Sequence, residues 1–383
     1  MALTRLPGIS PDVTGKYVVI RGLNERYTST LLNGIELPSP DPLKRAVPLD
    51  IFPTSLVGSV LIQKTYSAEY PGAFGGGVID IRTKVVPEES FFEIGLGTGY
   101  NSASTFKDGL TYYGSDTDVF GFDNGTRDLP AIIAANPTLE GMSAAELEQA
   151  GEAFPNIWSI DFQNNAPDFD FNTAGGTNWE VGDEGEVGII VAVDYGSKFR
   201  NKFGQRSSYK ASSATDSGLE ADRDFSPRAC EAVGVDGSEC GYDVTTWDID
   251  LNTFTSLGWQ INADHAIKYS SLLLRSSQKQ VEIQQGRTNS EDLANFTRLD
   301  WTERQVWSHS FDGEHAFDIF NDDMTEIFWH ANSTKATRDV SSSHFISIAP
   351  RSILNLVPAI TRKTGFLITR NTVSTWQMYQ MMN

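Results

Sequence analysis

Residues 247–259 have the sequence WDIDLNTFTSLGW, in which two kinds of side chain alternate. Aspartate, asparagine, serine and glycine occupy the even-numbered positions, where Phe254 is the exception. Successive side chains of a β-strand point to opposite faces of its sheet, so this stretch predicts a strand with one apolar and one polar face. The apolar face consists of Trp247, Ile249, Leu251, Thr253, Thr255, Leu257 and Trp259.

The length of this strand separates two β architectures. The twelve steps from Trp247 to Trp259 correspond to roughly 40 Å of strand at ~3.3 Å per residue, or about 28 Å of height at a tilt of ~45°. The apolar band of an outer-membrane barrel is ~25 Å tall and is bounded by aromatic side chains. Strands of soluble β-sandwiches, the alternative, average only ~5–6 residues. The stretch therefore favours a transmembrane β-barrel strand whose polar face lines the lumen.

Other segments extend this pattern over residues 85–345. Alternation is clear in 92–100 and 187–195 and weaker in the remaining candidate strands. Long polar loops and short turns separate the strands in alternation, as in outer-membrane barrels. One helix is expected within the first long loop, over 143–154, where Ser143 is a suitable N-cap. The weaker strands are 265–283, 296–311 and 324–337; the long loops are roughly 102–172 and 199–242, and the short turns are 182–186 and 262–265.

Composition excludes several classes of protein. The 383 residues carry 50 acidic and 30 basic side chains, a net charge of −20, and no basic cluster that could bind nucleic acid. No apolar run approaches the ~20 residues of a membrane-spanning helix, and the first ten residues lack the features of a signal peptide.

The sequence offers no catalytic or cofactor site. None of the five histidines has HExxH or CxxC neighbours, and no GxSxG nucleophile motif occurs. The acidic loop 116–130 could bind calcium, but it lacks EF-hand spacing, and a solvated acidic loop is the favoured interpretation. We therefore expect no enzyme activity, no metal and no cofactor.

The two cysteines, Cys230 and Cys240, lie in one polar loop rich in glycine, serine and aspartate. A disulfide would close this short loop and contribute roughly 2–3 kcal/mol. The alternative is two free thiols. Their placement favours the disulfide, which is typical of an oxidising compartment.

The N-terminal unit, residues 1–84, has a different texture. Asn33-Gly34 between apolar runs predicts a tight hairpin. Four glycines lie between residues 72 and 77, directly before the apolar strand 77–84. They match neither a Walker A loop nor GxGxxG, because Lys64 precedes them, so close backbone packing is the favoured explanation.

Residues 3–84 closely resemble the C-terminal part of the plug domain of TonB-dependent outer-membrane receptors. The stretch GSDTDVFGFDNGTRDLP, which ends at residue 130, is similar to a segment that follows the first barrel strand in one subgroup. The positions that carry the plug resemblance, taken as structural motif residues, include Arg21, Gly22, Asn33, Gly34, Lys64, Gly72, Gly75, Gly76, Gly77 and Arg82.

This resemblance implies a mainly β fold, with a small α/β plug domain inside an antiparallel transmembrane barrel of 22 strands. It implies a receptor in the bacterial outer membrane that takes up an iron–siderophore chelate, cobalamin or an oligosaccharide. The implied partners are outer-membrane lipid, a small ligand and a TonB-type energy-transducing protein, which binds an N-terminal box that is missing here. Gly72 to Gly77 would let the plug chain turn tightly before its last strand.

The sequence departs from this family pattern in its extent. It supplies about seven barrel strands, too few to close a barrel in lipid. We therefore expect a fragment with a partial barrel: the rear of the plug in 1–84 and the first barrel strands in 85–345. A truncated product without activity and a soluble β-rich binding module are the alternatives.

Residues 346–383 form an atypical tail. None of the 50 acidic residues lies beyond residue 339, and Pro350 and Pro358 would interrupt a central strand. This change predicts a frameshifted segment, with strand pairing lost near Phe345; a genuine basic loop is the alternative. Elsewhere we expect the apolar faces to point away from the plug, and Asp194, Asp248 and Asp250 to point to the lumen.

Overall fold

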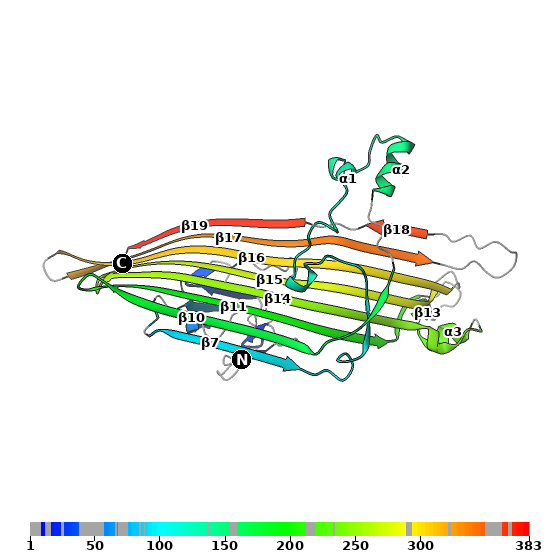
Figure 1. The fold of residues 1–383 in the computed structure, drawn as a ribbon, viewed down its shortest axis with the longest axis horizontal. Coiled ribbons are helices and arrows are strands. Elements are labelled where there is room, and N and C mark those ends of the chain that lie inside the picture. The colour runs from blue at the N-terminus through cyan, green and yellow to red at the C-terminus, as the bar shows by residue number, and fades with distance from the viewer. Residues whose placement is uncertain are drawn as a thin grey trace.

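A computed structural model describes residues 9–11, 17–23, 27–37, 57–65, 67, 76–83, 86–87, 89–136, 138–153, 159–211, 219–232, 234–288, 293–320, 323–348, 362–366 and 370–382. A small sheet packs on one face of a long antiparallel sheet, and another segment crosses the opposite face (Figure 1). No helix in these ranges is both long and apolar enough to cross a membrane.

The small sheet belongs to the N-terminal unit, which we call the plug. Its strand order is β4-β3-β6-β5, with β3 and β6 parallel and β5 antiparallel to β6. A two-stranded sheet of β1 and β2 accompanies it. The strands are β1 Ile9–Pro11, β2 Val18–Ile20, β3 Thr28–Leu32, β4 Ile35–Glu36, β5 Val57–Gln63 and β6 Gly77–Thr83.

The long sheet, which we call the wall, contains the six strands that the alternation predicts and a seventh, β10, which begins at Asp168 within the predicted loop 102–172. Each pairs antiparallel with the next. Two of the connecting turns are short: Val181 pairs with Gly185 across residues 182–184, and Asn262 pairs with His265 across residues 263–264. The hairpin of β12 (Arg206–Ala211) and β13 (Leu219–Phe225) branches from one end. The wall strands are β7 Phe91–Gly99, β10 Asp168–Val181, β11 Gly185–Gly204, β14 Gly241–Asn262, β15 His265–Thr288, β16 Leu293–Phe320 and β17 Asp323–Ile348.

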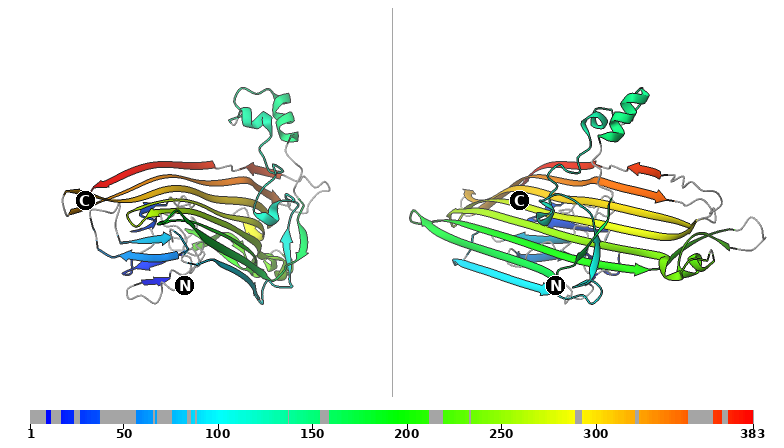
Figure 2. Two further views of the ribbon diagram at one scale, coloured as in Figure 1. Left: turned by 60° about the vertical axis from the view of Figure 1, so that its left-hand side comes forward. Right: turned by 45° about the vertical axis from the view of Figure 1, so that its right-hand side comes forward.

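The plug lies on the concave face of the wall (Figure 2). Phe254, Ala192 and Leu272 share this face by register and join one buried apolar cluster with Ile20 and Ile79 of the plug. The prediction that the even-numbered face of 247–259 points to the lumen is confirmed. Phe254 breaks the polar alternation because it contacts the plug.

The opposite face carries the apolar side chains of the strands. Phe92, Ile94 and Leu96 of β7 are exposed, as are Leu257 and Trp259 of β14. These residues point away from the plug, as predicted, and the mainly β fold with a small plug and an antiparallel wall is confirmed.

The segment that crosses this outer face covers part of it. We call residues 101–130 and 159–165 the clasp, and residues 131–153 its excursion. The clasp lies in front of the wall in Figure 1, with the plug behind. It buries Ile249, so the part of the predicted apolar face that lies farthest from the short turn 263–264 is covered by protein. The elements are β8 Asp108–Thr111, η5 Asp118–Phe120, α1 Ala131–Ala135, α2 Ala144–Glu152 and β9 Asp161–Asn164.

Helix α2 lies where the sequence predicts a helix. The Ser143 side chain accepts a hydrogen bond from the Glu146 backbone N–H, and the Glu146 carboxylate accepts one from the Ser143 backbone N–H. This capping box satisfies donors that a helix N-terminus leaves free, which fixes the start of α2 at Ala144.

The expected loss of strand pairing near Phe345 is wrong. Strand β17 continues to Ile348, and both β18 (Arg362–Phe366) and β19 (Arg370–Met382) pair with it antiparallel. Pairing at a sheet edge needs backbone donors and acceptors, which do not depend on acidic composition. Residues 349–361, with Pro350 and Pro358, lie outside the described ranges.

Candidate functional site at the plug and the lumenal wall

The Asn33-Gly34 hairpin fixes one edge of the plug. Both residues have positive φ, 52° and 82°, the backbone conformation of a type I′ turn. The Asn33 backbone N–H donates to the Ile81 carbonyl at 2.9 Å, and the Gly34 N–H donates to Asp80 Oδ1 at 2.9 Å. The turn is therefore anchored to the central strand β6.

Arg21 and Gly22 form a second turn, directly after β2. Their φ values are 53° and 76°, and the Leu23 N–H donates to the Ile20 carbonyl at 3.0 Å. This turn places Ile20 against the wall, where it is fully buried.

Gly76 and Gly77 lie where other parts of the plug come close. A Cβ at Gly77 would lie 2.7 Å from Ile20 Cδ1, closer than any real carbon contact, and one at Gly76 would lie 3.1 Å from Leu23 Cδ1. The bare backbone therefore lets β6 start directly beneath the Arg21-Gly22 turn. Gly72 and Gly75 lie outside the described residues.

The other motif residues of the plug are polar. Asp80 is buried and accepts a hydrogen bond from Arg82 Nε at 3.0 Å, while the Arg82 side chain remains largely exposed. Lys64 directly follows β5. Asp80 therefore links the hairpin turn, β6 and Arg82.

A polar group on the wall faces this part of the plug. Lys268 is buried, with Nζ 4.0 Å from an Asp312 oxygen, and both Asp80 and Arg82 are among the charges that act on it. Ser310 Oγ donates to Asp312 at 3.2 Å. The sequence patterns described above did not indicate this group, although lysine and aspartate occupy even-numbered, lumen-facing positions of β15 and β16.

Farther from the turns of the wall, its lumenal face carries paired charges. Arg200 Nη2 lies 2.6 Å from Asp168 Oδ2, and Lys198 Nζ lies 3.1 Å from Asp170 Oδ1. Gln278 donates to Asp248 at 2.6 Å. Asp194 and Asp250 share this face by register, in agreement with the predicted lumenal orientation. The surface offers donors and acceptors to a polar ligand.

No group of three or more His, Cys, Asp or Glu side chains in the described part of the chain could hold a metal ion.

The cysteine loop forms a compact cap beyond the lumenal charges, at the end of the wall opposite the short turns. Cys230 in α3 (Pro227–Glu231) is bonded to Cys240, which directly follows η6 (Gly237–Glu239), and their Cα atoms are 5.7 Å apart. Both cysteines are buried against Ala229, Val235 and Leu293.

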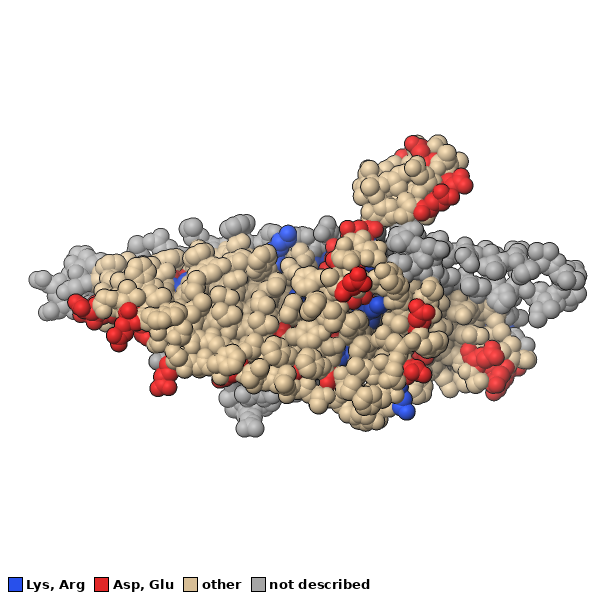
Figure 3. All heavy atoms as spheres, in the orientation of Figure 1, with Lys and Arg blue, Asp and Glu red and all other residues tan. Residues whose placement is uncertain are grey.

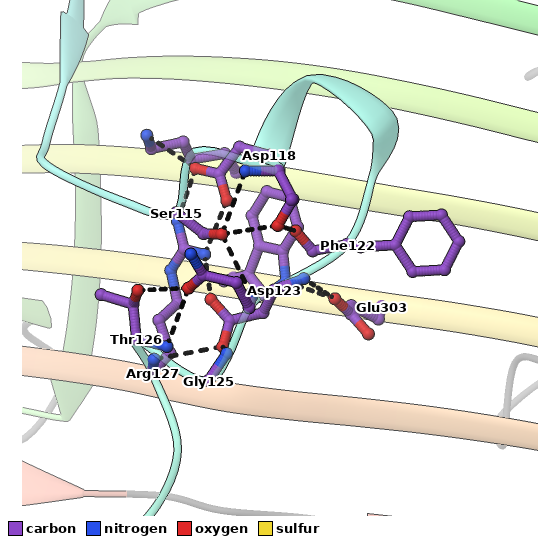
Figure 4. Close-up of polar contacts among 12 residues, drawn as sticks. Ser115, Asp118, Phe122, Asp123, Gly125, Thr126, Arg127 and Glu303 are labelled. Atoms are coloured by element: carbon purple, nitrogen blue, oxygen red, sulfur yellow. Dashed lines mark hydrogen bonds and ion pairs between the residues drawn. The ribbon is translucent and has the colours of Figure 1, made fainter.

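The clasp contains buried ion pairs. Arg127 donates to both oxygens of Asp118 at 2.7 Å and to Asp123 at 2.7 Å (Figure 4). Its guanidinium lies 4.4 Å from the Trp301 ring centroid. The expectation of a solvated acidic loop over 116–130 is wrong for Asp118 and Asp123, whose charges Arg127 and Lys279 of the wall compensate, whereas Asp116 and Asp128 are exposed.

Two groups of the clasp have shifted pKa values. Burial raises the pKa of Tyr112 well above its usual range, and the Arg127 guanidinium only partly opposes this. Burial alone would lower the pKa of Arg127, but its hydrogen bonds and charge pairing with Asp118 raise it instead. Arg127 therefore stays charged, and Tyr112 stays neutral, over the physiological range.

Residues 1–78 match the family model described as "TonB-dependent Receptor Plug Domain". No curated protein matches the sequence. Among solved structures, the outer membrane transporter YddB from Escherichia coli is similar at 11% identity and a TM-score of 0.31, over 99% of this chain and 51% of that one. The chain thus spans about half the length of that structure. Its N-terminal 78 residues belong to the plug domain family of TonB-dependent receptors.

Proposed function

We propose that this chain is part of an outer-membrane receptor that imports a scarce ligand with energy from a TonB-type protein. The observation that carries the proposal is the plug-family match over residues 1–78, in a sheet that packs on the concave face of the wall. Transport of this type agrees with the absence of a catalytic motif in the sequence. The candidate ligands are an iron–siderophore chelate, cobalamin or an oligosaccharide.

The apolar outer face of the wall favours a location in a membrane. Figure 3 displays this face, with charged side chains concentrated near the ends of the strands, on the clasp and on its excursion, and a largely uncharged surface between them. Trp259, Leu257 and Phe311 are exposed in this region. Exposed apolar side chains of this size are costly in water and favourable in lipid.

The lumenal face supports passage of a polar ligand. Paired charges such as Asp168 with Arg200 line the wall beyond the plug, where a ligand entering from the outer end would meet them. The plug itself contacts the wall through an apolar cluster. Apolar contacts have no directional requirement, so they permit the plug to shift without breaking a series of ion pairs.

In the test, cells produce the full chain behind a cleavable signal peptide that directs it to the periplasm, and membrane fractionation is the first measurement. The chain should partition with the outer membrane; recovery in the soluble fraction would favour the soluble binding module. Uptake is then measured with three radiolabelled probes: a ferric siderophore, cyanocobalamin and a malto-oligosaccharide.

Accumulation of one probe should stop when the proton gradient is collapsed. Stable insertion in the outer membrane without gradient-dependent uptake of any probe would support the truncated product without activity. A protein with Asp168→Asn and Arg200→Met serves as a matched lumenal variant, and its uptake should fall while its membrane fraction stays the same.

A further inference from the structure

We propose that the tip of the clasp, residues 118–122, is an anchor that inserts into the headgroup region of the outer leaflet. This inference rests on the proposed function, because it requires the wall to span the outer membrane. The anchor is an interaction surface on the outside of the barrel, separate from the lumenal site.

The tip is the part of the clasp nearest the lipid-facing surface. Tyr195 donates through its hydroxyl to the Val119 carbonyl at 2.8 Å, and Arg275 Nε donates to the Gly121 carbonyl at 2.7 Å. Tyr195 and Arg275 both lie level with Leu251 in the strand registers. The next outward-facing residues toward the short turns, Thr253 and Leu273, lie beyond the tip.

The rest of the clasp lies farther from the lipid-facing surface. The Leu110 N–H donates to Thr245 Oγ1 at 2.9 Å, six residues from Leu251 on the same strand. That separation corresponds to roughly 20 Å along the strand, or about 14 Å of height at a tilt of ~45°. The clasp therefore descends along the wall from β8 to its tip.

The tip presents apolar side chains to its surroundings. Val119 is 41% exposed, Phe120 58% and Phe122 36%. Phe122 also shields the Arg275 guanidinium, whose carbon lies 3.7 Å from the ring centroid. In Figure 4 the Phe122 ring points away from the polar cluster. In a wholly aqueous position, the exposed parts of these apolar side chains would contact only water.

The height of the apolar band gives a second argument. Below the clasp, the outward face of β14 runs for eight steps from Leu251 to Trp259. At ~3.3 Å per residue and a tilt of ~45°, this supplies about 19 Å of height. An outer-membrane barrel carries a band of ~25 Å. Amphipathic elements bury apolar groups ~5–10 Å into the headgroup boundary, which is the depth that the tip would supply.

On the side that faces the wall, the tip is held by polar contacts. Asp118 pairs with Arg127, and Lys279 Nζ of the wall lies 3.2 Å from Asp118. Glu303 accepts a hydrogen bond from the Asp123 N–H at 2.8 Å. The charges of Asp118 and Arg127 thus face the wall, and the apolar side chains of the tip face outward, as an interfacial anchor requires.

The test places a single cysteine at Phe120 in the full chain, reconstituted in phosphatidylethanolamine–phosphatidylglycerol vesicles. Cys230 and Cys240 are bonded to each other, so a thiol-reactive bimane labels only the new residue. Nitroxide lipids, labelled in the headgroup or deep in the acyl chain, and aqueous iodide quench the fluorophore according to its depth.

Two controls bracket the result. Leu257→Cys marks the lipid-facing wall, and Phe162→Cys marks an exposed aromatic position on the same clasp beside Leu110. We expect headgroup nitroxides to quench the label at 120 most, acyl-chain nitroxides the label at 257, and iodide the label at 162. Val119→Cys should behave like Phe120→Cys, which guards against a local effect of one substitution.

Labels at 120 and 119 that respond only to iodide, together with a lipid-buried label at 257, would overturn the anchor while leaving the proposed function intact. A label at 257 that responds to iodide would instead contradict a membrane-spanning wall. Quenching at 120 by acyl-chain nitroxides as strong as at 257 would also overturn the inference, because it would place the tip within the hydrocarbon region.

Discussion

The two faces of the wall hold their partners by different chemistry. On the concave face, plug and wall meet in an apolar cluster that includes Ile20, Ile79 and Phe254. On the convex face, the clasp is held by Arg127, Asp118 and hydrogen bonds to the wall. The first contact has no directional requirement, whereas the second depends on fixed positions of charged groups.

This difference suggests two mechanical roles. A partner that must move during transport is better held by contacts that tolerate small displacements. A partner that must keep a fixed position on the outer surface is better held by directional ion pairs. Displacement of either member breaks such a pair, so the pair opposes movement. If the two roles are distinct, the clasp and the plug should respond separately to substitutions on their own face of the wall.

The largest effect is expected for Arg127→Met. Removal of Arg127 leaves the carboxylate of Asp123 without this charge partner and that of Asp118 with Lys279 in place of two cations, and we expect the clasp to lose about 4 kcal/mol of local stability. Hydrogen exchange of residues 108–127 should accelerate while exchange in β6 stays the same. The matched change is Arg82→Met: this arginine is largely exposed and the buried Asp80 keeps its hydrogen bond from the Gly34 N–H, so the cost should be smaller, about 1 kcal/mol. Equal losses in both variants would contradict the contrast.

On the concave face, Phe254→Ala should destabilise the contact between plug and wall by about 3 kcal/mol, because it removes a buried aromatic side chain and leaves a cavity. The measurement is hydrogen exchange of the amides of β3 and β6. Leu257→Ala, three residues away on the opposite face, is the control and should leave plug exchange unchanged. If hydrogen exchange became faster in the clasp and not in β3 and β6, Phe254 would stabilise the clasp and not the plug, which would contradict this prediction.

Much of this architecture could be predicted from the sequence, because a strand with different faces shows a period of two. Trp247 to Trp259 indicated both the strand and its lumenal side, and Asn33-Gly34 indicated the hairpin that the φ values confirm. These signals are local: neighbouring residues generate them. The family resemblance of the plug also rested on short segments in order.

The clasp could not be predicted in the same way. Asp118 and Lys279 are far apart in the chain, and only the fold brings their side chains to 3.2 Å. Without that contact, an acidic loop looks solvated. The pairing at the edge of β17 was missed for a related reason: backbone hydrogen bonds leave little trace in composition.

A smaller effect is expected in the interior of the plug for Gly77→Ala. The new Cβ would lie 2.7 Å from Ile20 Cδ1, so Ile20 or β6 must shift, at a cost of about 2 kcal/mol. Gly34→Ala is the control: its surroundings are open, and only its positive φ opposes the substitution, at about 1 kcal/mol. Both losses of free energy can be obtained from hydrogen exchange of the β6 amides, under conditions in which the plug opens locally while the wall stays folded. A larger loss for Gly34→Ala would mean that turn strain outweighs packing.

The smallest effect concerns alkaline pH and the clasp. Burial raises the pKa of Tyr112, so an opened clasp would release the tyrosine proton near pH ~10 while the closed clasp retains it. The contribution of Tyr112 is therefore fully present below pH ~10 and decreases as pH rises above it, by about 1 kcal/mol over the first pH unit. Hydrogen exchange of residues 108–127 across this range should reveal the decrease. Tyr112→Phe should remove this dependence, at the cost of the hydrogen bond from the tyrosine hydroxyl to the Asp300 carbonyl. Tyr113→Phe, at the exposed neighbour, should retain it. A clasp that loosens equally with pH in the Tyr112→Phe protein would assign the effect to another group, because phenylalanine has no proton to lose.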